Sequence, residues 1–130
     1  MFEPQANILF SGDIDLSPFG PWYGNVCSDL EEFVASINRI IDLNPKVLVT
    51  SHAGIISDHI PERLKRYSEM IDLRDEQILK HLQDSKEAAD LLGKKIIFNR
   101  YPEPQKAYRF FEQTMLEKHL QHLAKQGKII

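Results

Sequence analysis

The sequence predicts an α/β protein, with a small parallel β-α-β core followed by a mainly helical C-terminal tail. Two short apolar runs, at residues 8–10 and 47–49, enclose one amphipathic stretch. A crossover helix between two strands normally joins parallel neighbours. From residue 57 onward the apolar residues recur at helical spacing. We therefore predict two domains, residues 1–56 and residues 57–130.

The first apolar run is Ile8-Leu9-Phe10, and Ser11-Gly12-Asp13 follows it directly. A short continuous apolar run predicts a strand that is buried on both faces. Gly12 can adopt backbone angles closed to other residues, so we expect the strand to end there and to deliver Asp13 to the edge of a sheet. Asp15 is expected to cap a loop amide, with contact to a metal site as the alternative.

The stretch after residue 27 predicts one helix. Ser28 and Glu31 form a capping-box pattern, and Pro45 disfavours helical angles at the residue before it. The apolar positions between them are Leu30, Phe33, Val34, Ile37, Ile40 and Ile41. We expect the helix to end between Asp42 and Asn44.

The second apolar run, Val47-Leu48-Val49, leads through Thr50-Ser51 to His52. Parallel strands end at the same edge of a sheet, and ligand sites lie at that edge. Asp13 and His52 are therefore expected within a few ångströms of each other, as potential metal ligands. The alternatives are an ordinary Gly-Asp turn and a buried histidine bonded to a carbonyl.

Residues 17–27 are expected to form a loop, because prolines and glycines interrupt any periodicity. Phe19, Trp22 and Tyr23 lie in this loop. They are predicted either to wall a substrate pocket or only to cover the core.

The tail is predicted to hold several helices. One runs through about Leu73, a second holds Ile78 and Leu82, a third follows Ser85, and a last one extends from about Gln105 to Lys125. The apolar candidates for burial in the last helix are Phe110, Phe111, Met115, Leu116, Leu120 and Leu123. His119 and His122 share a face of it; packing is expected, with a zinc pair as the alternative. His59 is expected on the surface near a helix start, with support of a metal ligand as the alternative.

Composition limits the class of protein. The formal net charge of −3 gives no general attraction to nucleic acid. Cys27 is the single cysteine, which excludes an internal disulfide and fits a reducing compartment. No apolar stretch approaches a membrane span, and the first residues lack the features of a signal peptide. The expectation is a cytoplasmic protein without membrane or nucleic-acid partners.

Three motifs resemble the second half of the metallo-β-lactamase fold: Leu9-Phe10-Ser11-Gly12-Asp13, Phe19-Gly20-Pro21-Trp22-Tyr23-Gly24 and Ser51-His52-Ala53-Gly54. The resemblance implies that Asp13 bridges two metal ions and that His52 completes the ligands of the second. Residues 74–79 and 119–128 resemble the helical, winged-helix-like tail of some members.

The chain departs from this family in one respect. Members carry a His-x-His-x-Asp-His motif in the first half of the fold, followed by another histidine. The five histidines here are His52, His59, His81, His119 and His122, and none forms a His-x-His pair. The expectation is therefore the C-terminal half of a metallohydrolase, without the half that supplies most metal ligands.

The ligand types suit zinc, iron or manganese. In the parent, the resemblance implies a dinuclear site whose metal-activated hydroxide attacks a small-molecule substrate; redox use of iron is an alternative. The chain alone is expected to be inactive, and possession of bound metal is left open. It is also expected to form a homo-oligomer through an uncovered sheet face. The competing hypotheses are a non-catalytic binding or regulatory module with a winged-helix-like tail, and an inactive stable fragment.

Overall fold

The computed structural model describes residues 2–12, 14–17, 19–24, 29–51, 53–82 and 88–129. The chain divides into two compact units. The first comprises residues 1–22 and 33–71, and the second comprises residues 23–32 and 72–130. The predicted domain boundary after residue 56 stays a prediction.

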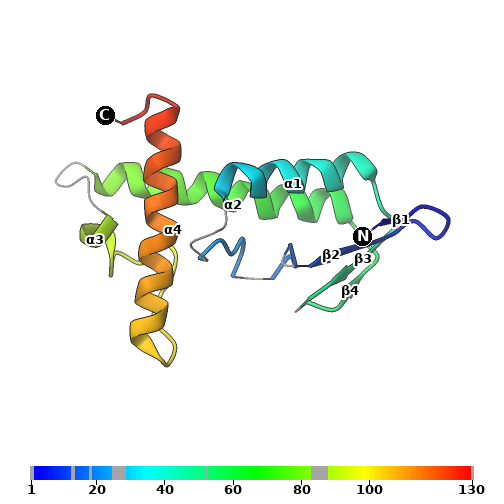
Figure 1. Cartoon of the computed structure of the whole chain (residues 1–130), viewed down its shortest axis with the longest axis horizontal. Coiled ribbons are helices and arrows are strands. Elements are labelled where there is room, and N and C mark those ends of the chain that lie inside the picture. The colour runs from blue at the N-terminus through cyan, green and yellow to red at the C-terminus, as the bar shows by residue number, and fades with distance from the viewer. Residues whose placement is uncertain are drawn as a thin grey trace. The chain divides into compact units, whose positions relative to one another are not determined.

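The first unit contains a mixed four-stranded sheet in the order β1-β2-β3-β4 (Figure 1). The strands are β1 (Phe2–Glu3), β2 (Ile8–Gly12), β3 (Val47–Thr50) and β4 (Ile55–Ile56). β2 and β3 are parallel, and the two outer pairings are antiparallel. The parallel pair confirms the β-α-β core that the sequence predicts.

One face of this sheet is buried and the other is exposed. Leu9, Leu48 and Ile56 are register partners across β2, β3 and β4, and all three are buried. They pack with Ile37 and Leu64 of the helices that cover this face. Partner residues project to the same side of a sheet, so the adjacent row belongs to the opposite face. That row contains Phe10, which is 52% exposed, and the expectation that β2 is buried on both faces was therefore wrong for this chain.

The crossover helix is α1 (Leu30–Leu43), which ends where Pro45 predicts. Its first turn is capped by Asp29, whose carboxylate accepts the Glu31 N–H at 2.9 Å. Ser28, the predicted cap, lies outside the described residues. Ile37 and Ile40 direct the apolar side of the helix into the core of the first unit.

Helix α2 (Ile60–His81) is continuous, although the sequence predicted two helices over this range. The predicted break coincides with the charged residues Arg74 and Asp75. These residues are 5% and 7% exposed. Their side chains form hydrogen bonds with other buried polar groups instead of with water. No glycine occurs in the helix, and Pro61 lies in its first turn, where proline is tolerated.

The second unit also contains the short helix α3 (Ala88–Leu91) and α4 (Gln105–Lys125). Both limits of α4 confirm the prediction, and Gly127 ends it with φ +74°. The buried apolar residues of this unit include Ile78, Ala88, Leu91, Ile97, Phe98, Met115, Leu116 and Leu123. Phe110, predicted to be buried, is 54% exposed. None of the helices in the described ranges has the length and apolar character needed to cross a membrane.

Candidate functional site

The C-terminal ends of the two parallel strands lie side by side. Gly12 is the register partner of Thr50 across a local irregularity in the ladder, and the Ser51 N–H donates to the Gly12 carbonyl at 3.1 Å. Gly12 has φ +60°, the left-handed backbone for which glycine was expected here. Asp13 and His52 follow these strand ends in the sequence, but both lie outside the described residues, so their separation stays a prediction.

Two neighbours of these strand ends are described. The Asp15 carboxylate accepts the Ser17 N–H at 3.1 Å, which confirms the expected loop cap. His59 is exposed and directly precedes α2, as expected of a residue near a helix start. Within the described part of the chain, no three histidine, cysteine, aspartate or glutamate side chains gather as a metal site would require.

The aromatic loop residues divide into two kinds. Phe19 and Trp22 are half-buried in the first unit, with ring centroids 5.8 Å apart. Tyr23 is 1% exposed and belongs to the core of the second unit. The interpretation of the rings as a pocket wall is therefore restricted to Phe19 and Trp22, because Tyr23 is engaged elsewhere.

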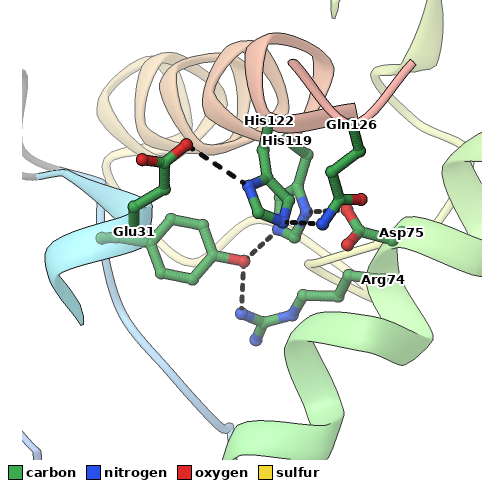
Figure 2. Close-up of polar contacts among 7 residues, drawn as sticks. Glu31, Arg74, Asp75, His119, His122 and Gln126 are labelled. Carbon is green, nitrogen blue, oxygen red and sulfur yellow. Dashed lines mark hydrogen bonds and ion pairs between the residues drawn. The ribbon is translucent and has the colours of Figure 1, made fainter. Parts of the chain in front are cut away.

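Tyr23, Arg74, Asp75 and His119 form a buried chain of hydrogen bonds, which we call the Tyr23 network (Figure 2). Arg74 Nη1 donates to the Tyr23 hydroxyl at 3.0 Å, and that hydroxyl contacts His119 Nε2. His119 Nδ1 lies 2.6 Å from Asp75 Oδ1. A carboxylate can only accept, so Nδ1 carries the hydrogen and Nε2 accepts from Tyr23. The Arg74 Nη1, Tyr23 hydroxyl and His119 Nδ1 donors thus each meet an acceptor.

Burial dominates the electrostatics of this network. It lowers the pKa of His119, and the nearby Arg74 charge acts in the same direction, while Asp75 opposes them. It also raises the pKa of Tyr23 from 10.0 to about 12, with the Arg74 charge opposing. The network therefore favours a neutral imidazole and a neutral phenol between one cation and one anion.

Further contacts tie α4 to the residues around Tyr23 and the start of α1. Lys118 Nζ donates to the Tyr23 carbonyl at 2.7 Å. Lys125 Nζ lies 3.4 Å from the Glu31 carboxylate. His122 Nδ1 lies 3.8 Å from the same carboxylate (Figure 2). His119 and His122 thus contact different partners, and His119 packs as expected.

A cavity of about 530 Å³ lies beside these ion pairs. Its lining includes Glu31, Phe110, Lys118 and His122. Charges of both signs surround it, so the lining does not select a ligand of one charge. We assign no function to this cavity.

Comparison with known proteins adds one relative. The chain is 28% identical to the beta-lactamase-like protein 2 homolog of Drosophila melanogaster. The alignment spans 128 residues and covers 93% of this chain but 39% of that protein. No protein-family model matches the chain. The similarity supports the resemblance to the metallo-β-lactamase fold.

The Tyr23 network predicts how stability depends on pH. The pKa of His119 is lowered in the fold, so between that pKa and the unfolded value of about 6.5 only the unfolded chain binds the proton. The contribution of His119 to the free energy of unfolding is thus fully present above about pH 6.5 and decreases as the pH drops below that value. Tyr23 acts oppositely: its stabilisation is complete below pH 10.0 and falls as the pH rises toward about 12.

Urea titrations across the pH range measure both effects. The rise in the pKa of Tyr23 corresponds to on the order of 3 kcal/mol lost over the alkaline range. Tyr23→Phe removes the titrating group, so its free energy of unfolding should fall less steeply than that of the wild type above pH 10. Parallel alkaline profiles for the two proteins would contradict the assignment.

Proposed function

We propose that the chain is part of a metal-dependent hydrolase with the metallo-β-lactamase fold, and that it supplies Asp13 and His52 to a dinuclear site. The observation that carries the proposal is the junction of the two parallel strand ends, where Ser51 hydrogen-bonds Gly12. These are the residues that directly precede His52 and Asp13 in the sequence. The similarity to a beta-lactamase-like protein supports the fold on which this proposal depends.

The side chains of Asp13 and His52 are of types that bind such a metal pair. A carboxylate and an imidazole are ligands that zinc, iron and manganese accept. When bound, such a metal pair supplies a hydroxide at neutral pH and polarises the bond under attack. Gly12, in its left-handed conformation, ends β2 directly before the proposed bridging carboxylate. Phe19 and Trp22 are proposed to limit access of water to a small-molecule substrate.

A chain that supplies only part of the ligand set should bind metal weakly by itself. Asp13 and His52 are two ligands, whereas stable zinc sites use three or four protein ligands. We therefore propose that this chain resembles the C-terminal half of the fold with a winged-helix-like tail, and that alone it binds metal weakly and hydrolyses little. The chain spans about two fifths of the relative's length. The hydrolase activity is therefore proposed for a larger protein of which this chain is a part.

Nuclear magnetic resonance with Mn²⁺ tests the ligand assignment without requiring activity. Substoichiometric Mn²⁺ should broaden the amide resonances of Gly12, Asp13, Ser51 and His52 before others, at metal concentrations that indicate weak binding. Asp13→Ala and His52→Ala should each abolish this selectivity, whereas Asp58→Ala, which alters an exposed carboxylate, should not. Broadening that is unchanged in both ligand variants would refute the assignment, and tight stoichiometric binding would refute the weak-site proposal.

The proposed partner is a second copy of the chain, bound through the exposed face of the sheet. Phe10, Val49 and Ile55 form one register row across β2, β3 and β4 on that face. Phe10 is 52% and Ile55 is 73% exposed. Apolar patches of this kind usually mark an interaction surface.

A further inference from the structure

The connection between α3 and α4 concentrates positive charge in a chain whose net charge is −3. We call five exposed residues the cationic end: Lys94, Lys95, Arg100, Lys106 and Arg109. Glu103 is the single exposed carboxylate between Gly93 and Phe111. This stretch therefore has a net charge of about +4 at neutral pH, opposite in sign to that of the whole chain.

Contacts hold these charges together on one part of the second unit. The Glu112 carboxylate, 1% exposed, accepts the Phe98 N–H at 2.8 Å and the Tyr101 hydroxyl at 2.7 Å. Arg109 lies over the Tyr101 ring, with its guanidinium carbon 5.9 Å from the centroid. The loop that bears Arg100 is thus fixed against the first turns of α4.

The two lysines belong to the same cluster. A hydrogen bond links the Gly93 backbone to the Tyr101 hydroxyl, and Lys94 and Lys95 follow Gly93 in the chain. Lys95 has φ +58°, a left-handed conformation that is uncommon for residues other than glycine. The turn therefore presents a lysine where glycine would be less strained.

The surroundings of the cationic end distinguish among anionic partners. The Phe98 ring packs against the rings of Tyr101 and Tyr108, with centroids 6.3 and 5.7 Å away, and Arg109 covers Tyr101. These rings are already engaged, whereas single-stranded nucleic acid requires open rings in a charged groove. The five charges project from a turn and a helix end, and the cavity described above includes none of them.

A projecting cationic surface with an exposed aromatic residue fits a flat anionic partner. Phe110, which also lines the edge of that cavity, is 54% exposed and lies one residue after Arg109 and one turn after Lys106. We propose that the cationic end binds the surface of a membrane that contains anionic lipids, with Phe110 entering the headgroup region. Peripheral binding of this kind combines charge attraction with burial of apolar side chains and needs no spanning helix. This proposal departs from the expectation of no membrane partner, which was based on the lack of a spanning segment and of a signal peptide.

Vesicle co-sedimentation with the full chain tests this proposal. Binding is expected to phosphatidylcholine vesicles that contain about 30% phosphatidylserine, and to weaken strongly when salt rises from about 0.05 to 0.5 M. Lys94→Glu with Lys95→Glu should lower the partition coefficient by at least about 30-fold, since each basic residue near such a surface contributes about 1 kcal/mol. Phe110→Ser should lower it further without altering the salt dependence.

Matched controls separate this surface from general charge. Lys65→Glu with Arg66→Glu makes the same change of charge at exposed positions of α2 and should retain more binding than the Lys94/Lys95 variant. Equal binding to pure phosphatidylcholine vesicles, or an equal loss in both charge variants, would overturn the proposal. Binding of a fluorescent single-stranded oligonucleotide that depends on Lys94 and Lys95, without vesicle binding, would identify nucleic acid as the partner and likewise overturn it.

Discussion

Replacement of Asp75 by alanine should lower the free energy of unfolding by about 1–3 kcal/mol, the cost of leaving a buried donor without its acceptor. Asp75 is 7% exposed and accepts the His119 Nδ1 hydrogen at 2.6 Å. Its removal leaves that buried donor without an acceptor. The loss also affects the rest of the Tyr23 network, because Tyr23 links His119 to Arg74.

Urea denaturation measures this effect, with two matched variants. Asp72→Ala alters an exposed carboxylate on the same helix, nearly one turn earlier, and should change stability by less than about 0.5 kcal/mol. Asp75→Asn retains the acceptor oxygen and removes the charge, so it should be intermediate and remain measurable if the alanine variant fails to fold. Equal stabilities for Asp75→Ala and Asp72→Ala would show that the Tyr23 network does not stabilise the fold.

The sequence indicated the β-α-β core but could not indicate this network. Periodic apolar residues and a proline located α1 and the two parallel strands, because these signals act within a few residues of one another. Tyr23 and His119 are 96 positions apart, and Tyr23 and Arg74 are 51 apart. Only tertiary structure brings such groups together. The sequence held one signal of a buried polar group: His119 lies in the apolar stripe of α4, one turn from Met115 and one turn from Leu123.

The same limitation explains the error in α2. The sequence predicted one helix through about Leu73 and a second that holds Ile78, and the charged residues Arg74 and Asp75 lie between them in one continuous helix. Their burial is possible because partners distant in sequence satisfy them. The placement of Asp13 and His52 remains a prediction, although the parallel pairing on which it depends is confirmed.

The exposed face of the sheet should make the chain dimeric at micromolar concentration. The row of Phe10, Val49 and Ile55 presents apolar surface on the face opposite the core. Removing such surface from water contributes roughly 25 cal/mol per Å². The same patch on two copies can pack about a two-fold axis. A patch of this size, on the order of a few hundred Å², is smaller than the roughly 800 Å² per partner of a standard interface, so the dissociation constant should be micromolar rather than nanomolar.

Sedimentation velocity over a range of concentrations tests this expectation. The wild type should shift from monomer to dimer through the micromolar range, and Phe10→Ser with Ile55→Ser should remain monomeric, because the two most exposed members of the row are removed. Leu43→Ser with Leu73→Ser is the matched control, since these leucines are 46% and 57% exposed but lie on helices. That control should still dimerise. A wild-type chain that stays monomeric at the highest concentrations, or a control that dissociates as readily as the sheet variant, would show that association does not proceed through this face.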